Sequence, residues 1–313
     1  MKTKVKVEHC IQILALLPFI MSIQHVAVIG GTGQLGKPVV RELVQAGFTV
    51  TVLVRKAELA RQLFGDTVRI VTADLADAAS LRAGLQGQDA LYLNLSVDPG
   101  SKITDWQPER EGLKSALQIA RELNLQRVVY LSSLIMHYEK SQWWVFKVKH
   151  QADELVKTSG IPYTILKPSM FFDIFDGNQR RGNALMATGP AANPMYPIAG
   201  EDYGKQVAAA LRLPTAANRV YPVQGPEQLS SGQAAERYVR AYPHGKLQIK
   251  RLPFGLERFL SLFIPMMDYL KHIVTAIENH PEPFQSQQTW DELGKPIMTV
   301  EDFARCRQPW TGN

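Results

Sequence analysis

The stretch HVAVIGGTGQLGKPVV, residues 25–40, joins a short β-branched run to closely spaced glycines and an amphipathic continuation. The run predicts a buried strand, and 34–47 predicts a helix with its apolar side chains on one side. Gly31, Gly33 and Gly36 fit the pattern G-x-G-x-x-G, and Gly30 with the last two fits the variant G-x-x-G-x-x-G. A strand, a glycine turn and a helix in this order predict the opening βαβ unit of an α/β fold.

The glycines also predict a ligand. Glycine adopts positive φ and lets backbone N–H groups approach a pyrophosphate, while the start of the helix offers partial positive charge. A glycine turn without a ligand is the alternative, but it does not explain why three residues of low helix propensity stand together at the start of a helix. The predicted cofactor cradle consists of Gly30, Gly31, Thr32, Gly33, Gln34, Leu35 and Gly36.

The end of the second predicted strand, 48–54, indicates which dinucleotide binds. NAD-preferring sites usually carry a carboxylate here, whereas this chain has Arg55 and Lys56. A guanidinium can bind a 2'-phosphate, so NADP(H) is the preferred cofactor and NAD(H) the alternative. Arg55 is also consistent with a solvated strand end. Asp74, after the third strand, either approaches adenine or caps a helix.

The same alternation of strands and helices continues along the chain. Further strands are predicted at 68–75, 89–96, 126–133 and 162–168, and helices at 78–86, 108–123 and 146–159. Apolar strands separated by helices form a parallel sheet that is covered on both faces. The prediction for 23–170 is therefore a doubly wound, Rossmann-type α/β domain.

After Pro168 the alternation breaks. Residues 171–205 are rich in Gly, Pro and Asn and predict long loops near a ligand mouth. A smaller α+β C-terminal subdomain for substrate or lid is predicted over 171–313, interleaved with the last strands of the sheet. Its predicted elements are a strand at 218–225, a helix at 230–242 capped by Ser230 or Ser231, a strand at 246–253 and a helix at 254–277.

The helix predicted at 254–277 is amphipathic and rich in Met and Phe. We expect it to cover a substrate cleft or a dimer surface, and membrane contact is the less favoured interpretation.

The first 22 residues precede the glycine motif. Lys2, Lys4 and Lys6 stand before an apolar run at 10–23, as in a secretory signal. The run is short and interrupted for a membrane span, and no small-residue cleavage site follows it. We favour a dispensable extension or an upstream start codon, with the domain beginning near Met21, over a signal or an anchor.

Composition narrows the class of protein. The net charge is +6 with a pI near 9.2, but the basic residues are spread along the chain, which argues against a nucleic-acid partner. Cys10 and Cys306 fit no metal or redox spacing and favour a reducing compartment, the cytoplasm. We expect a monomer or homodimer that acts on a small molecule or binds a protein partner.

Several phrases resemble a known superfamily. GGTGQLG, LVR at the second strand end, SGIPYTILKPSMF, VYPVQGPEQLS and TWDELGKPIMTVEDF resemble short-chain dehydrogenases/reductases, in particular the atypical NmrA-like NAD(P)-binding branch, from residue 24 to about 305. The resemblance implies that the nicotinamide lies beside the ends of the fourth, fifth and sixth strands. The residues implied there are Asn94, Leu95, Ser96, Ser132, Ser133, Pro168, Ser169 and Met170.

The resemblance also implies a catalytic set. In catalytic relatives a Ser polarises the substrate carbonyl, a Tyr donates the proton, and a Lys four residues after the Tyr lowers its pKa and holds the ribose. Ser133 matches the first role, and Lys149, with Asp153 after it, best matches the Lys. Lys147 and Lys149 are equally consistent with solvated positions on a helix.

The tyrosine is missing. Val145 stands four residues before Lys149, and Trp143 stands four before Lys147. Tyr138 and His137 follow the fifth strand off register, and a catalytic role for them is the minor alternative to a loop or packing role.

Two functions follow from these residues. The first is an NADPH-dependent reductase of a small apolar carbonyl, quinone or enone, with 171–175 and 262–269 providing an apolar site. The second is a non-catalytic NADP(H)-binding redox sensor or regulatory or assembly protein, which the missing tyrosine favours.

Overall fold

The computed structural model describes residues 23–138, 143–177, 179–187, 193–251, 255 and 259–308. The expectation about residues 1–22 lies outside these ranges. No helix in the ranges is long and apolar enough to cross a membrane.

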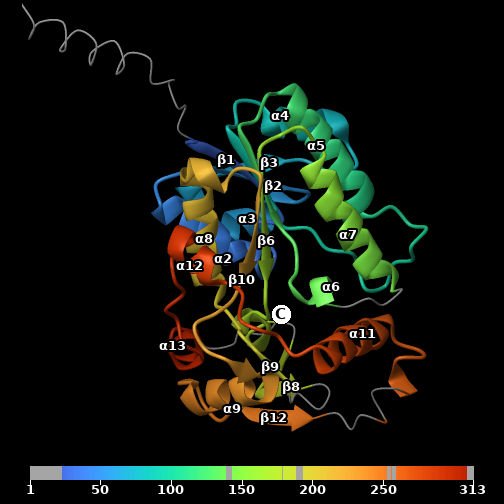
Figure 1. Ribbon diagram of the computed structural model, residues 1–313, viewed down its shortest axis with the longest axis vertical. Coiled ribbons are helices and arrows are strands. Elements are labelled where there is room, and N and C mark those ends of the chain that lie inside the picture. Colours follow the sequence, from blue (N-terminus) through green and yellow to red (C-terminus); the bar gives the residue numbers. More distant parts are fainter. Residues whose placement is uncertain are drawn as a thin grey trace, which may run out of the picture.

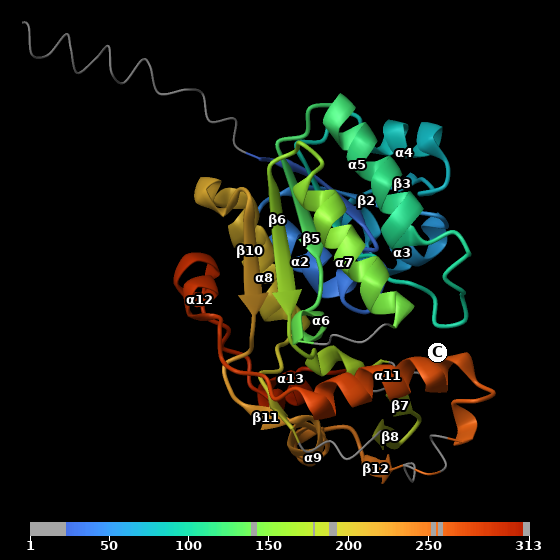
Figure 2. The same ribbon diagram turned by 45° about the vertical axis from the view of Figure 1, so that its right-hand side comes forward.

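A seven-stranded parallel sheet forms the centre of the molecule (Figures 1 and 2). Its strand order is β10-β6-β5-β4-β1-β2-β3, so the order reverses between β4 and β1. This confirms the doubly wound Rossmann-type prediction. The strands are β1 (His25–Ile29), β2 (Thr49–Val54), β3 (Arg69–Thr72), β4 (Ala90–Leu93), β5 (Arg127–Leu131), β6 (Tyr163–Pro168) and β10 (Arg219–Val223).

Both faces of the sheet are buried. Val26 and Val28 of β1 point into one apolar cluster, and Ala27 and Ile29 point into the other, as the two-residue period of a strand requires. Figure 1 shows α2 and α8 on one side of the sheet and α5 and α7 on the other. The covering helices are α2 (Gly36–Gln45), α3 (Ala57–Phe64) and α8 (Gly200–Arg212) on the first face, and α4 (Ala78–Leu85), α5 (Leu113–Glu122) and α7 (Trp144–Lys157) on the second.

The C-terminal elements build a second apolar core. A three-stranded sheet and a two-stranded sheet pack there with α9 and α13. Ser230 caps α9, because its Oγ accepts from Gln233 N at 3.1 Å and the Gln233 side chain accepts from Ser230 N. These elements are β7 (Arg180–Arg181), β8 (Ala184–Ala187), β9 (Pro194–Met195), β11 (Leu229–Ser230), β12 (Gln248–Arg251), α9 (Ser231–Ala241) and α13 (Val300–Arg305).

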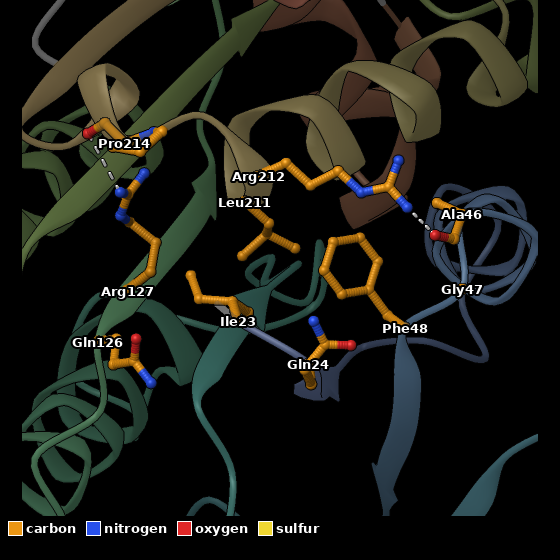
Figure 3. A pocket seen from close by; sticks show the side chains of 10 residues that line it. All are labelled: Ile23, Gln24, Ala46, Gly47, Phe48, Gln126, Arg127, Leu211, Arg212 and Pro214. Carbon is orange, nitrogen blue, oxygen red and sulfur yellow. Dashed lines mark hydrogen bonds between the residues drawn. The ribbon is translucent and has the colours of Figure 1, made fainter. Parts of the chain in front are cut away.

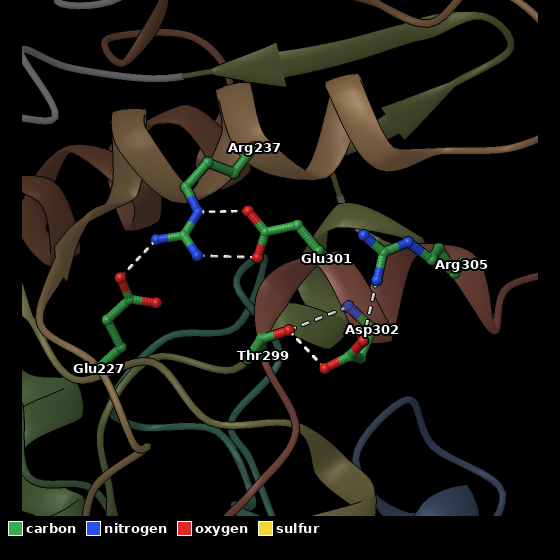
Figure 4. Close-up of polar contacts among 6 residues, drawn as sticks. All are labelled: Glu227, Arg237, Thr299, Glu301, Asp302 and Arg305. Atoms are coloured by element: carbon green, nitrogen blue, oxygen red, sulfur yellow. Dashed lines mark hydrogen bonds and ion pairs between the residues drawn. The ribbon is translucent and has the colours of Figure 1, made fainter.

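One arginine joins α9 to α13 (Figure 4). Arg237 donates two parallel hydrogen bonds to Glu301, at 2.5 and 2.8 Å, and a third to Glu227 at 2.6 Å. Thr299 caps α13 by accepting from Asp302 N at 3.2 Å. The two helices thus close the C-terminal core from one side.

Three predictions about this half of the chain need correction. From sequence we group the strand at 218–225 with the C-terminal pieces, but β10 pairs with β6 in the main sheet. The loops predicted over 171–205 contain β7, β8, β9 and the start of α8. The helix predicted at 254–277 is interrupted: residues 255, 259 and 260 are helical, 261–263 form a turn, and α11 (Pro265–Asn279) starts at a proline, which is suited to the first helical turn.

Helix α11 lies under the carboxyl edge of the main sheet, beside α6 (Ile135–Tyr138) and the start of α7, in both ribbon views. Two short helices, η2 (Pro108–Gly112) before α5 and α12 (Gln287–Leu293) beside β10, complete the parts that matter for the site. Helix α11 therefore covers part of the carboxyl edge of the Rossmann domain.

The opposite, amino edge of the sheet carries a cavity of about 350 Å³ (Figure 3). Arg127 is buried there and donates to the Ala210 carbonyl at 3.0 Å and to Thr164 Oγ1 at 3.2 Å. Arg212 donates to the Ala46 carbonyl. Both guanidinium groups thus bind backbone or hydroxyl oxygens at the amino edge, remote from the glycine loop.

Candidate functional site

The glycine loop lies at the carboxyl end of β1 and leaves no room for side chains at two positions. Gly30 has φ +81°, and a Cβ there would lie 2.1 Å from the Asn94 carbonyl oxygen. A Cβ on Gly36 would lie 2.1 Å from the Gly30 carbonyl oxygen. Helix α2 then starts without a side-chain cap, and the N–H groups of Gly36 and Lys37 donate to the Gly33 carbonyl at 3.1 and 3.0 Å, so the helix presents its positive end at the loop, where a phosphate is favoured.

The other loop positions have different environments. Gly31 lies against Val28 and Val40, whereas Gly33 is exposed and its N–H donates to the Gly30 carbonyl at 3.1 Å. Thr32 is half-buried, and Leu35 packs against the core on the α2 face of the sheet.

Gln34 is held by the C-terminal part of the chain. Its Nε2 donates to the Asp173 carbonyl, and a Cβ on Gly177 would collide with its side chain. The segment 173–177 therefore passes directly over the cofactor loop. Sequence assigns Gln34 to the cradle but contains no signal for this contact across 139 positions.

The second and third strands also end at this edge. Arg55 and Lys56 are exposed and follow β2, which pairs with β1 up to Leu53 and Ile29. Asp74 is half-buried after β3, and its Oδ1 accepts from Ala76 N at 2.9 Å.

The alternative that Asp74 caps a helix is wrong. Asp77 caps α4 by accepting from Ala79 N at 3.0 Å and Ser80 N at 3.4 Å. Contact of Asp74 with adenine stays a prediction.

The residues implied for the nicotinamide end lie on the neighbouring strands. Asn94 N donates to the Ile29 carbonyl at 3.1 Å, which puts β4 and the glycine loop side by side where the strand order reverses. Such a reversal is where ligands bind to open α/β sheets. Ser96 is exposed two residues further on.

Strands β5 and β6 bring the remaining residues. Ser132 is 1% exposed, its N donates to the Leu166 carbonyl at 2.8 Å, and its Oγ has no hydrogen-bond partner among the described residues. Ser133 is half-buried at the next position. The Pro168 carbonyl accepts from Leu134 N at 3.0 Å.

Ser169 contacts a residue that sequence analysis missed. Its Oγ donates to Glu282 at 2.8 Å, and Gln224 Nε2 donates to the same carboxylate at 2.6 Å. Glu282 is buried on the segment after α11, and burial raises its pKa although these donors lower it. This contact anchors the segment after α11 to the carboxyl edge of the sheet.

Lys149 is not a solvated residue. Its Nζ forms an ion pair with Glu109 and donates to the Leu95 carbonyl at 3.2 Å, and its side chain is 12% exposed. Glu109 is buried on η2 and also accepts from the Tyr130 hydroxyl at 2.9 Å. Sequence analysis missed Glu109, since a glutamate at a helix start is usually solvated. Lys147, in contrast, is exposed.

Other residues near Lys149 have partners of their own. Asp153 forms an ion pair with Lys167 at 2.6 Å. Phe172 and Phe175 of the segment 171–175 are buried in the C-terminal core, and neither lines the 310 Å³ cavity described next. The side chains of 137 and 138, the minor catalytic alternative, lie outside the described residues.

A cavity of about 310 Å³ opens beside this site. Its walls are the loop 99–102, residues 143–145 at the start of α7, and 261–265 with Asp268 and Tyr269 of α11. Val145, where the tyrosine is missing, is buried and lines it one helical turn before Lys149. The cavity is mostly apolar and aromatic on the α7 and α11 sides.

A family model described as NAD(P)H-binding matches residues 30–214, more than half of the chain. The chain belongs to this NAD(P)H-binding family. The match confirms the cofactor class predicted from the glycine loop. Gly30 and Gly36 also fit the cofactor. A Cβ at either position would collide with a backbone oxygen, and glycine there lets the backbone of the loop come close to a pyrophosphate.

Individual relatives of this NAD(P)H-binding protein differ in role. It is 27% identical to the NAD(P)H azoreductase of Xenophilus azovorans over 300 residues, 90% of this chain and 97% of the relative. It is 30% identical to the photosystem II assembly factor Ycf39 of Cyanophora paradoxa over 148 residues, 47% of this chain and 46% of that protein. The chain thus matches less than half of that assembly factor.

Its fold is similar to that of the NADPH-dependent quinone oxidoreductase QOR2 of Escherichia coli, solved with NADPH. The TM-score is 0.69 at 20% identity, over 89% of this chain and 98% of that one. The NAD(P)H-binding protein therefore combines a glycine loop at the carboxyl edge of its sheet with a cavity between the start of α7 and the segment 261–269.

Proposed function

We propose that this protein is an NADPH-dependent reductase of a small apolar carbonyl, quinone or enone. The cavity one helical turn from Lys149 carries the proposal, because the residues of α7 and of 262–265 in its wall are apolar or aromatic. Leu262 and Phe263 in its wall are 72% and 70% exposed, and exposed apolar side chains at a cavity suit an apolar ligand. Such a ligand would reach the nicotinamide end of the cofactor.

NADPH is the proposed cofactor because the second strand ends in two cations. Arg55 and Lys56 are exposed beside the glycine loop, so either side chain can bind a 2'-phosphate. A charge-assisted hydrogen bond contributes about 1.5–3 kcal/mol, or roughly 10- to 100-fold in affinity. Arg55→Asp should therefore weaken NADPH far more than NADH in a fluorescence titration. An equal loss for both cofactors would contradict the assignment.

The roles of the chain's own residues follow from their positions. Bound NADPH supplies a hydride. Ser133 would donate a hydrogen bond to the substrate oxygen, and Lys149, which is held by Glu109 and the Leu95 carbonyl, would orient the ribose. The Glu109 ion pair also keeps the ammonium group in one position without substrate.

The decisive experiment is NADPH oxidation by the full chain with a panel of aldehydes, quinones and enones. Turnover that Ser133→Ala or Lys149→Ala abolishes, with NADPH still bound, supports the reductase. Gln118→Ala, an exposed change on α5, serves as a control that should keep the wild-type rate. Tight NADPH binding without turnover across the panel would refute the proposal.

The second candidate is a non-catalytic NADP(H)-binding regulatory or assembly protein. Val145 favours it, because this position carries the proton donor in catalytic relatives and valine has no proton to give. Partial similarity to an assembly factor is in line with it. This candidate predicts NADPH binding and no hydride transfer.

A further inference from the structure

The position that lacks its tyrosine is covered by another tyrosine. Val145 forms a small buried cluster with Val97 and Val148, and Tyr269 of α11 packs against this cluster. Tyr269 also lines the 310 Å³ cavity together with Val145. An aromatic ring with a hydroxyl group therefore lies next to the site that a tyrosine at 145 would occupy.

The orientation of α11 supports this placement. Ile273 and Ala276 lie four and seven residues after Tyr269, on the same side of the helix. They pack against Met136 of α6 and Phe146 of α7. The side of α11 that carries Tyr269 is thus the side that faces the Rossmann domain.

Trp143 fixes the tyrosine ring. The Trp143 and Tyr269 rings meet edge to face, with centroids 5.1 Å apart at 68°. About one helical turn after Tyr269 on α11, the His272 ring stacks on the Trp143 ring, with centroids 4.6 Å apart. Two contacts of one tryptophan therefore hold this part of α11 against the start of α7.

The surroundings of Tyr269 keep its hydroxyl protonated. Burial, and to a smaller extent the Glu109 carboxylate, raise the pKa of Tyr269 to about 12. The phenol is therefore a weaker acid than a free tyrosine, but it is still more acidic than an aliphatic alcohol and can protonate an alkoxide. Since Glu109 is the partner of Lys149, the phenol also lies within electrostatic reach of that ion pair.

We propose that Tyr269, supplied by α11, is the catalytic proton donor in place of the tyrosine missing at Val145. The inference rests on the proposed reductase function. The carbonyl carbon of the substrate accepts a hydride with its electron pair from NADPH, which is oxidised to NADP⁺. The carbonyl π pair moves to oxygen, the Tyr269 O–H bond breaks, and the oxygen takes the proton to give an alcohol. Solvent then reprotonates the phenolate.

Tyr269→Phe in the full chain tests this assignment with 4-nitrobenzaldehyde as the probe. Phenylalanine keeps the ring contact with Trp143, so the fold and the NADPH dissociation constant should stay within about twofold of wild type. Loss of a general acid should lower kcat about 100-fold or more. The matched control is Tyr196→Phe, a half-buried tyrosine that packs on Phe284, which should keep the wild-type rate.

A binding measurement adds a readout that needs no turnover. With NADP⁺ bound, no hydride can pass, and loss of one neutral hydrogen bond should weaken 4-nitrobenzaldehyde about 2- to 10-fold in Tyr269→Phe. A variant with wild-type kcat and wild-type aldehyde affinity overturns the role of Tyr269 and leaves the reductase intact. No NADPH oxidation by the wild type with any substrate overturns the reductase and the inference with it.

Discussion

Asp173 should make the stability of this protein depend on pH. Its side chain is 6% exposed, and its Oδ2 accepts from Gly200 N at the start of α8, at 2.8 Å. Burial, with a smaller contribution from Glu201, raises the pKa of Asp173 to about 7, while the Gly200 hydrogen bond and Arg307 oppose this. The backbone carbonyl of the same residue holds Gln34 of the cofactor loop.

The sign follows from proton binding. The pKa of Asp173 rises from 3.8 in the unfolded chain to about 7 in the folded one, so the folded state binds the proton more tightly. This contribution to stability is complete below about pH 4 and is lost as the pH rises through 7. At 1.36 kcal/mol per pKa unit the whole effect is about 4 kcal/mol, of which about 2 kcal/mol falls between pH 5.5 and pH 8.

Urea unfolding at 25 °C, at pH 5.5 and at pH 8, measures this effect. Asp173→Asn keeps an oxygen that can accept from Gly200 N but removes the titration. The wild type should lose about 2 kcal/mol more unfolding free energy between the two pH values than the variant does. Asp66→Asn, which removes an exposed carboxylate, should behave like the wild type. Equal pH dependence in wild type and Asp173→Asn would refute the reasoning.

Three more outcomes follow from single contacts. Gly36→Ala brings a Cβ to 2.1 Å from the Gly30 carbonyl oxygen, so the loop must shift and NADPH affinity should fall at least about 10-fold by fluorescence titration; unchanged affinity would contradict the cradle. Arg127→Met removes the guanidinium bonds to Thr164 and the Ala210 carbonyl and should cost about 2 kcal/mol in urea unfolding. Arg237→Ala removes the two parallel hydrogen bonds to Glu301. Because both side chains are 27% exposed, the loss should lower the free energy of unfolding by only about 1 kcal/mol, and a double-mutant cycle of Arg237 with Glu301 checks this.

Sequence by itself determined the Rossmann half of the fold. The strands β1 to β6 and the helices α2, α4, α5 and α7 lie within a few residues of the predicted ranges, whereas α3 and α6 were not predicted. Ser230 caps α9 as one of two predicted candidates. These features depend on periodicity, glycine conformation and capping, which act between residues close in the chain. Gly36 belongs to the same class, because its nearest neighbour is Gly30 of the same turn, whereas the contact of Gly30 with Asn94 depends on the packing of β4 beside β1.

Tertiary structure alone decided the contents of the site. Lys149 meets Glu109 across 40 positions, and Tyr269 meets Val145 across more than 100. Neither contact has a local signature, since a glutamate at a helix start and a tyrosine on an amphipathic helix are common on solvated surfaces. Their partners were set when η2, α7 and α11 packed at the carboxyl edge of the sheet, because burial and side-chain contact depend on packing between elements and not on spacing along the chain.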